Sequence, residues 1–369
     1  MEFPPSSTQT KTLEYRIENA HDFAWFADKR FNVIRGEVEL PESGRKVITY
    51  AYFPDKHGKN WMTAAGYVGR AVLFYSDHVG EYPWNVAQAV DGTLEVEGAG
   101  GMEYPTITVI AGDHDPETLD NVITHEVGHN WFYGILGSNE REHAWMDEGI
   151  NSFYENRYMD TYYERSNALG LPEEAIAFLG GDASSPDQTV WMFNQVMQCQ
   201  NRYQPVDIHA AEYTPINYGL VVYMQTAYYF RYLQDVLGTD EFDRIMHIYY
   251  KEYQFKHPYP EDIQAVFERE TGESYAWFFT KLLQADRGPD YKVSHMQKAK
   301  TAVAVTVSNK SDIPAAFSIS LMSGDSVLRT DWYRGFTGSQ TVFLNIEPGW
   351  DVTSVYLDQQ KYLPETNRE

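Results

Sequence analysis

Two histidines four residues apart, His125 and His129, lie in a segment whose local signals predict a helix. Asp115 is a typical N-cap residue, Pro116 suits the first helical position, and apolar residues then recur at helical spacing. The spacing puts both imidazoles on one face, about one turn apart, where they can bind one metal ion. Glu126 lies about 100° around the axis from His125 and can face that ion without being a ligand. By itself, the H-E-x-x-H pattern also fits two ordinary histidines, so its interpretation depends on further ligands.

A tetrahedral catalytic zinc site needs a third protein ligand and leaves its fourth position for water. Glu148 is the candidate, because it lies at the start of a second helix that we expect from about Met146 to Tyr163. A carboxylate at that point can fold back over the first helix. Its neighbour Asp147 can accept the free ring N–H of a liganding histidine and so fix the tautomer. The alternatives are local roles, with Glu148 interacting with the helix dipole and Asp147 serving as an N-cap.

The composition argues against some classes of function. The chain has 369 residues, of which 53 are acidic and 29 basic, giving a net charge of −24. A field of this sign repels phosphate backbones, so we do not expect nucleic-acid binding, and it favours cationic ligands such as the amino terminus of a peptide. The simpler interpretation is that the acidic surface keeps the protein soluble. Cys199 is the only cysteine, so the chain forms no internal disulfide and no thiolate zinc cluster.

Targeting signals are not evident in the sequence. The amino-terminal residues lack the basic and apolar regions of a signal peptide, and no run of 18 uninterrupted apolar residues predicts a transmembrane segment. The absence of a signal does not decide the cellular compartment if the chain is part of a longer protein. An extracytoplasmic location is therefore compatible with the sequence.

Length and periodicity predict more than one compact unit. Residues 1–20 are polar and rich in Pro, Ser and Thr, which indicates a tail or the remnant of a preceding domain. Residues 21–288 are expected to form an α+β domain whose later part is mostly helical. At about Lys292 the hydrophobic period changes from 3.6 to 2, so residues 289–369 are predicted to form a small β-sandwich.

Three elements are predicted ahead of the histidine helix. Lys46–Phe53 (KVITYAYF) has the composition of a strand, and apolar residues at helical spacing indicate a helix from about Asn60 to His78. Glu103–Ala111 alternates and is rich in β-branched residues, so it is predicted to be a strand. Pro105 near its start suggests a position at the edge of a sheet.

These motifs resemble a known family. Glu148 lies 19 positions after His129, the H-E-x-x-H-x18-E spacing of the M1 aminopeptidases, which belong to the gluzincins. The flanking sequences HEVGHNWFYG and WMDEG are also similar to those of the family. Upstream, the sequence GGMEY, which ends at Tyr104, resembles the G-x-M-E-N exopeptidase motif. Downstream, Tyr223 with Gly238 fifteen positions later resembles the segment that carries the family's catalytic tyrosine.

The resemblance covers about residues 20–283, together with the small β domain that follows in many members. It implies an α+β, thermolysin-like zincin domain with a mixed sheet, an edge strand and a helical subdomain. It also implies one Zn²⁺ per chain and a metal-activated water that releases amino-terminal residues from peptides with a free amino terminus. The residues that it assigns are the zinc ligands His125, His129 and Glu148, the catalytic base Glu126, the oxyanion-stabilising Tyr223, and the substrate-binding Gly101, Met102 and Glu103, with Glu103 holding the ammonium group.

The sequence departs from the family's pattern in three ways. Tyr104 replaces the Asn of the exopeptidase motif, which bears on recognition of the substrate backbone. Gln225–Thr226 replaces the usual Lys-Gly after the catalytic tyrosine, so Tyr218 is an alternative to Tyr223. Members usually begin with a large saddle-like β domain, for which too few residues precede the first strand. We therefore expect that the natural protein lacks this domain or that the chain is a fragment.

Other functions are compatible with the same motifs. An endopeptidase and an M61-like glycyl aminopeptidase would use the same metal chemistry. A catalytically inactive scaffold that binds peptides or proteins would keep the zincin fold without the reaction. The retained ligands, base and tyrosine favour the enzyme over the scaffold.

Overall fold

The computed structural model describes residues 7–92, 94, 100–163, 196–197, 200 and 202–363. Cys199 lies outside these residues. The chain separates into two compact units. The first comprises Met1–Glu140, Met146–Tyr163 and Asp243–Pro258, and the second comprises Arg141–Trp145, Glu164–Phe242 and Tyr259–Glu369. Within the predicted tail, the described residues 7–20 contain neither helix nor strand. The predicted domain limits at residues 20 and 288 stay predictions.

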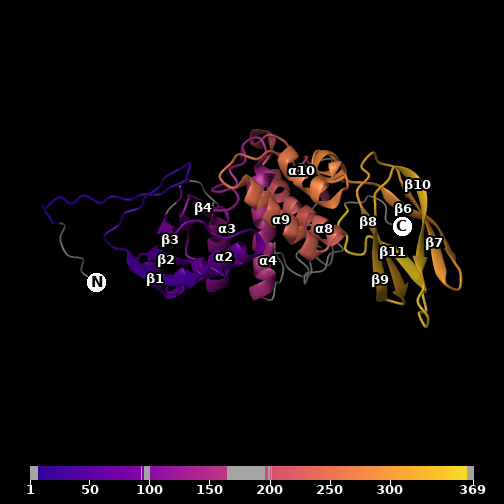
Figure 1. Ribbon diagram of the computed structural model, residues 1–369, viewed down its shortest axis with the longest axis horizontal. Coiled ribbons are helices and arrows are strands. Elements are labelled where there is room, and N and C mark those ends of the chain that lie inside the picture. The colour runs from indigo at the N-terminus through magenta and orange to yellow at the C-terminus, as the bar shows by residue number, and fades with distance from the viewer. Residues whose placement is uncertain are drawn as a thin grey trace. The chain divides into compact units, whose positions relative to one another are not determined.

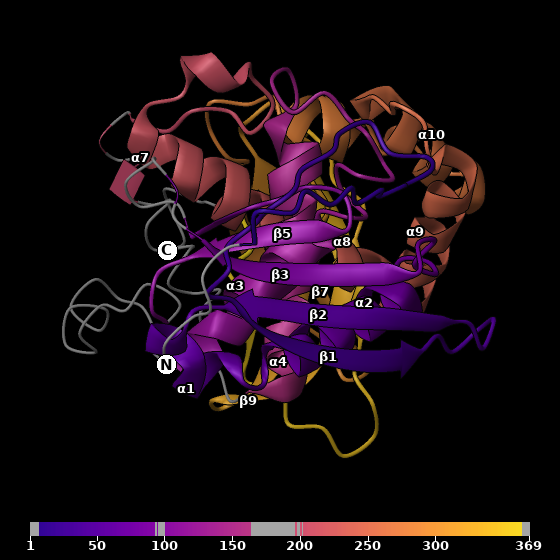
Figure 2. The same ribbon diagram turned by 90° about the vertical axis from the view of Figure 1, so that its left-hand side faces the viewer.

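A five-stranded mixed sheet forms one layer of the first unit, seen face-on in Figure 2. Its order is β1-β2-β3-β5-β4. Strands β1 and β2 form an antiparallel pair, β2, β3 and β5 run parallel, and β4 is antiparallel to β5. The strands are β1 (Asn32–Glu39), β2 (Lys46–Phe53), β3 (Val86–Gly92), β4 (Gly101–Met102) and β5 (Ile107–Ala111).

The strand predicted at Lys46–Phe53 is confirmed as β2. Every second residue of this strand is buried, because that face of the sheet is covered by α2 (Ala64–His78). The helix predicted from Asn60 is two helices, since α1 (Gly58–Trp61) and α2 are separated by a turn at Met62–Thr63. Helices α2, α3 and α4 lie behind the sheet in Figure 2.

The prediction that Glu103–Ala111 is an edge strand is wrong in both extent and place. The strand begins only at Ile107 and pairs with β3 on one side and β4 on the other. Pro105 and Thr106, whose φ is 68°, instead form the turn between β4 and β5, where Ile107 N donates to Tyr104 O at 3.1 Å. Pro105 therefore marks a turn, and the edge position belongs to β4.

Helix α3 (Pro116–Gly128) begins where the sequence predicts. The Asp115 side chain accepts hydrogen bonds from the backbone N–H groups of Glu117 and Thr118 at 3.0 and 3.2 Å. The helix packs against α2, β5 and α4. The last turn of α3 lies beside β4, because Gly101 of that strand packs against the Glu126 side chain.

Helix α4 (Ile150–Tyr162) follows a π-helical turn, η2 (Trp145–Gly149), close to the predicted start at Met146. Arg157 on α4 makes two hydrogen bonds, of 2.6 and 2.8 Å, to the Asp243 carboxylate. Asp243 belongs to α9 (Thr239–Tyr253), so this pair fixes α4 against the part of α9 that lies in the first unit.

The second unit contains helices followed by the predicted β region, drawn in orange to yellow in Figure 1. The strands form two three-stranded sheets, ordered β10-β7-β6 and β11-β8-β9. Buried residues alternate along β7, whereas most of β8 is buried, as expected for a small β-sandwich. The helical elements of this unit are η3 (Ala210–Glu212), α7 (Pro215–Asn217), η4 (Tyr218–Gln225), α8 (Thr226–Leu237), α10 (Pro260–Thr271) and η5 (Trp277–Leu282). The strands are β6 (Tyr291–Lys298), β7 (Ala302–Asn309), β8 (Phe317–Ser323), β9 (Ser326–Tyr333), β10 (Gly338–Asn345) and β11 (Ser354–Leu357).

Among the described residues, every helix is too short or too polar to cross a lipid bilayer.

Candidate metal centre

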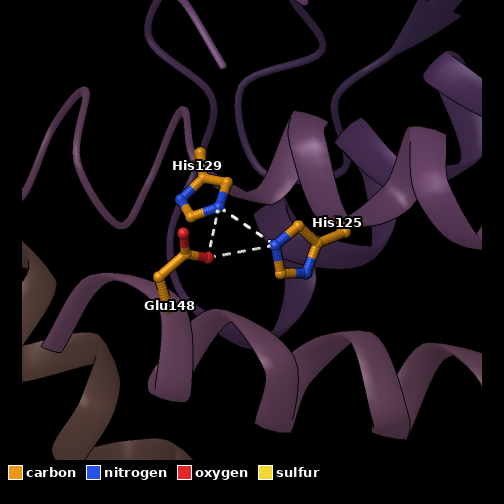
Figure 3. A group of neighbouring side chains, drawn as sticks. All are labelled: His125, His129 and Glu148. Carbon is orange, nitrogen blue, oxygen red and sulfur yellow. Dashed lines mark hydrogen bonds and ion pairs between the residues drawn. The ribbon is translucent and has the colours of Figure 1, made fainter. Parts of the chain in front are cut away.

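The end of α3 and the π-helical turn η2 bring together three atoms that could hold a metal ion, within the first unit (Figure 3). His125 Nε2 and His129 Nε2 lie 3.2 Å apart, and Glu148 Oε2 lies 3.2 Å from the first and 3.1 Å from the second. His125 lies in the last turn of α3, His129 is the C-cap residue of that helix, and Glu148 comes from the π-helical turn ahead of α4. The residues predicted as ligands therefore form one compact triangle.

The other ring nitrogen of each histidine has an acceptor of its own. His125 Nδ1 lies 2.9 Å from Glu155 Oε2, and His129 Nδ1 lies 2.8 Å from Asp147 Oδ1 and 3.0 Å from Phe132 O. In the neutral imidazoles that a metal ion requires, Nδ1 therefore carries the proton, which leaves a lone pair on Nε2.

In this neutral form, two Nε2 lone pairs and a carboxylate oxygen converge on one point, an arrangement that is repulsive unless a metal ion or a proton lies between them. Zinc bonds of 2.0–2.1 Å in tetrahedral geometry place ligand atoms about 3.3 Å apart, close to the distances in this triangle. The donor set therefore fits a zinc ion.

Charges around the triangle shift the titration of its members. Burial lowers the pKa of His125, but hydrogen bonds to Glu148 and Glu155 outweigh burial and raise this pKa to about 10. Burial also lowers the pKa of His129. The charges of the Asp147 and Glu148 carboxylates outweigh burial, so this pKa lies well above its usual value. Without an ion, the neighbouring carboxylates therefore favour the protonated form of both imidazoles. A metal ion has to displace these protons, so binding is expected to release them.

Glu126 lies beside the triangle and is only 6% exposed. Its Oε2 is buried and, within the described part of the chain, has no hydrogen-bond partner. Burial raises the pKa of Glu126 to about 8, so this carboxyl can exchange a proton near neutral pH. A Cβ atom at Gly101 would overlap the Glu126 carboxylate, which explains why glycine is needed on this part of β4.

The residues of the GGMEY sequence lie next to the triangle. Glu103 is buried, and its carboxylate lies within 4.8 Å of ligating atoms of both His129 and Asp147. Gly101 and Met102 form β4, the last strand of the described sheet, so one side of β4 has no neighbouring strand there. A peptide can in principle pair with such an edge.

Tyr223 belongs to the second unit, where it lies in η4 and is half-buried. Its ring contacts that of Tyr218, with centroids 5.8 Å apart. Both tyrosines lie in the second unit, so the role of either one at the metal triangle stays a prediction.

Glu155 is a site residue that the sequence reasoning missed. It lies on α4 seven residues after Glu148, about two helical turns along, and therefore on the same face of the helix. This spacing was the available signal, since a carboxylate on that face can reach the free nitrogen of the first histidine. Glu155 and Asp147 thus serve His125 and His129 in equivalent ways.

The fold and the triangle together define a class of protein. A mixed sheet backed by a helix with an H-E-x-x-H sequence, followed by a helix that begins beside a glutamate, is the architecture of the zincin peptidases. The model of the peptidase family M1 domain matches residues 70–282 of the chain. The chain belongs to peptidase family M1.

Curated relatives are similar over part of the chain. Aminopeptidase M1-C of Oryza sativa is 25% identical over 151 residues, which are 41% of this chain and 16% of that protein. Leucine aminopeptidase 2 of Chaetomium globosum is 27% identical over 170 residues, which are 42% of this chain and 24% of that protein. The chain thus spans a quarter or less of the length of these two relatives.

A solved structure shares the fold. The crystal structure of Legionella pneumophila aminopeptidase A in complex with aspartic acid aligns with a TM-score of 0.64 and 11% sequence identity. The alignment covers 85% of this chain and 36% of the other. The predicted α+β class, a zincin-type domain followed by a small β domain, is confirmed.

Proposed function

We propose that this protein is a zinc-dependent aminopeptidase. The observation that carries the proposal is the convergence of His125 Nε2, His129 Nε2 and Glu148 Oε2, at 3.1–3.2 Å from one another, in a member of peptidase family M1. Both Nε2 lone pairs are directed by carboxylate partners, so the three side chains would hold one Zn²⁺.

Glu126 is the general base of the proposed reaction. When bound, zinc supplies a Lewis acid that polarises the scissile carbonyl and lowers the pKa of the attacking water. The buried carboxylate of Glu126 takes the proton from that water and passes it to the leaving amine. Its unpartnered oxygen is free to do so, because no donor of the described residues competes for it.

Glu103 and β4 determine which end of a peptide is cut. The substrate pairs with the open side of β4, and its terminal ammonium binds the Glu103 carboxylate. This pairing stops the peptide from sliding through the site, which distinguishes an aminopeptidase from an endopeptidase. The oxyanion is assigned to the Tyr223 hydroxyl, with Tyr218 as the alternative.

The first experiment measures zinc content and hydrolysis of aminoacyl-4-nitroanilides for the wild type and for Glu126→Gln. We expect one zinc per chain in both proteins and a loss in kcat of roughly 10²–10⁴-fold in the variant. Glu117→Gln is the matched control, because Glu117 is an exposed residue on the same helix. A wild type without stoichiometric zinc after purification without chelators would rule out the proposal. Zinc without activity in either protein would point to the scaffold.

The second experiment compares peptides with free and acetylated amino termini, using Glu103→Gln. The wild type should cleave only the free peptides, and the variant should lose roughly 10- to 100-fold in kcat/KM on them, the value of a hydrogen bond to a charged group. Equal cleavage of acetylated and free peptides would instead identify an endopeptidase. Tyr223→Phe beside Tyr218→Phe decides which hydroxyl acts on the oxyanion, because only one of these substitutions should lower kcat.

A further inference from the structure

Gly128 is the last residue of α3 and lies directly before His129, at a point where a side chain of α4 packs against α3. A Cβ atom at residue 128 would overlap both the Asn151 side-chain oxygen and the Tyr75 hydroxyl. Glycine at this position therefore leaves room for a side chain from α4 and one from α2 to reach the backbone of α3.

Those two side chains form a buried hydrogen-bond chain that ends on a metal-ligating residue. The Tyr75 hydroxyl donates to Asn151 Oδ1 at 2.7 Å, and Asn151 Nδ2 donates to the backbone carbonyl of His125 at 2.7 Å. Tyr75 and Asn151 are both 0% exposed. Because Asn151 Oδ1 accepts the hydrogen bond from Tyr75, the amide is oriented with its N–H group directed at the backbone carbonyl of His125.

The position of Asn151 in the sequence places it between the two carboxylates that face His125. It comes three residues after Glu148 and four residues before Glu155. Glu148 approaches His125 Nε2 and Glu155 approaches its Nδ1, while Asn151 holds its backbone. About two turns of helix, from Glu148 in η2 to Glu155 in α4, thus contact His125 at three points.

The carbonyl that Asn151 contacts belongs to the last turn of α3. The intrahelical bond from His129 N to His125 O is long, at 3.3 Å, so this turn is weakly held by the helix itself. The amide of Asn151 supplies a shorter second bond to the same carbonyl, and this stabilises the turn that sets the distance between the two imidazoles.

We propose that Asn151, oriented by Tyr75, is a positioning residue of the metal site. It fixes the glutamate-bearing start of α4 against the histidine-bearing end of α3, so that the triangle of ligating atoms is formed before the ion binds. This inference rests on the proposed zinc site, because it concerns the geometry of the same ligands. It extends the proposal to two residues that touch neither the ion nor the substrate.

The test measures zinc affinity by chelator competition, the visible absorption spectrum of the Co²⁺-substituted protein, and the thermal midpoint Tm. The variants are Asn151→Ala and Tyr75→Phe. Tyr154→Phe is the matched control, since the Tyr154 hydroxyl is buried on the same helix and has no hydrogen-bond partner in the described residues. We expect Asn151→Ala to weaken zinc binding by roughly 10- to 100-fold, as for outer-shell partners of metal ligands. Tyr75→Phe should weaken zinc binding less than Asn151→Ala does. Both variants should show an altered Co²⁺ absorption spectrum.

The outcomes separate this inference from the proposed function. A wild type that binds neither zinc nor Co²⁺ contradicts the proposed function itself. The inference is overturned if the wild type binds zinc and the variants have a lower Tm but unchanged zinc affinity and Co²⁺ spectrum. Asn151 and Tyr75 would then act only on stability. If Asn151→Ala does not fold, Tyr75→Phe against Tyr154→Phe decides, because both keep the volume of the side chain.

Discussion

Helices α3 and α4 share two buried polar clusters of opposite character. Around Asp120, in the middle of α3, acceptors meet donors: its carboxylate accepts from the Arg70 guanidinium and from the hydroxyls of Tyr158 and Tyr163. Around the metal triangle, further along the same helix, two imidazoles in their neutral form and a carboxylate present acceptors to one another. The guanidinium of Arg70 also lies over four tyrosine rings, those of Tyr67, Tyr158, Tyr162 and Tyr163.

This difference separates a structural cluster from a functional one. A buried charge with all its partners present needs nothing from outside the protein. A group of lone pairs that face one another is completed only by a cation. Substitutions in the Asp120 cluster should therefore change stability and leave metal affinity alone, whereas changes at the triangle should affect metal affinity and activity first.

Removal of the metal is expected to have the largest effect. Dialysis against a chelator should lower peptidase activity by at least about 10³-fold, since Lewis-acid stabilisation is worth several kcal/mol. The far-UV circular dichroism should stay unchanged, because the Asp120 cluster holds α3 and α4 together without the ion. Adding zinc at 100 times its Kd should restore activity and raise the free energy of unfolding by about 2.7 kcal/mol. If activity survives after the chelator has removed all zinc, the metal triangle is not the functional cluster, and the contrast with the Asp120 cluster is wrong.

Breaking the Asp120 cluster should give the next largest effect, on stability. Arg70→Met removes the cation and leaves the Asp120 carboxylate, which is 0% exposed, with only its tyrosine donors. We expect a loss of about 3 kcal/mol in denaturant unfolding, with zinc affinity unchanged. Arg35→Met is the control, because Arg35 pairs with Glu37 at the surface, where such a pair contributes less than about 1 kcal/mol. If Arg70→Met lowers zinc affinity as much as it lowers stability, the Asp120 cluster and the metal triangle are energetically coupled and cannot be treated as separate clusters.

Glu155 should show a smaller and purely functional effect. Glu155→Ala removes the acceptor that keeps the proton of His125 on Nδ1. Zinc affinity is expected to fall about 10-fold, the lower end for partners of metal ligands, with little change in Tm. Chelator competition measures the affinity, and Glu117→Gln again serves as the unaffected control. An unchanged affinity would mean that the tautomer of His125 does not depend on Glu155.

The smallest effect is expected at the amino-terminal end of α3. Asp115→Ala removes the N-cap and should cost about 1 kcal/mol of the free energy of unfolding at pH 7. Hydrogen bonds from Thr118 lower the pKa of Asp115 below its value in the unfolded chain, about 3.9. The stabilisation is therefore present above that value and is lost as pH falls through the lower folded pKa. Unfolding measured at pH 7 and pH 3 should show a smaller difference between wild type and variant at pH 3.

Local features of the site followed from the sequence because they depend on residues close together in the chain. The N-cap Asp115, the helix after it and the shared face of His125 and His129 all result from spacing within one helix. Glu148 could be proposed because it opens the next helix along. The alternation of Lys46–Phe53 likewise identified a strand with one buried face.

Features that depend on packing were missed or misplaced. Pro105 suggested an edge strand, yet strand order depends on which neighbours pair, and the edge belongs to β4. Glu155 and Asn151 are ordinary residues of a helix until α4 packs on α3, and Tyr75 reaches them from α2. The spacing of Glu155 from Glu148 was a usable local signal, but the partners of Asn151 and Tyr75 are distant in sequence, so no local pattern reveals those two residues.

The sequence by itself determined the ligand types, their spacing and the family, because metal chemistry constrains residue identity and helix geometry constrains position. Only the tertiary structure decided how the ligands are oriented, since the carboxylates and the amide that direct them come from other elements. Hydrogen bonds of 2.7–2.9 Å require atoms from α2, α3 and α4 to meet, and that meeting is a property of the packed core.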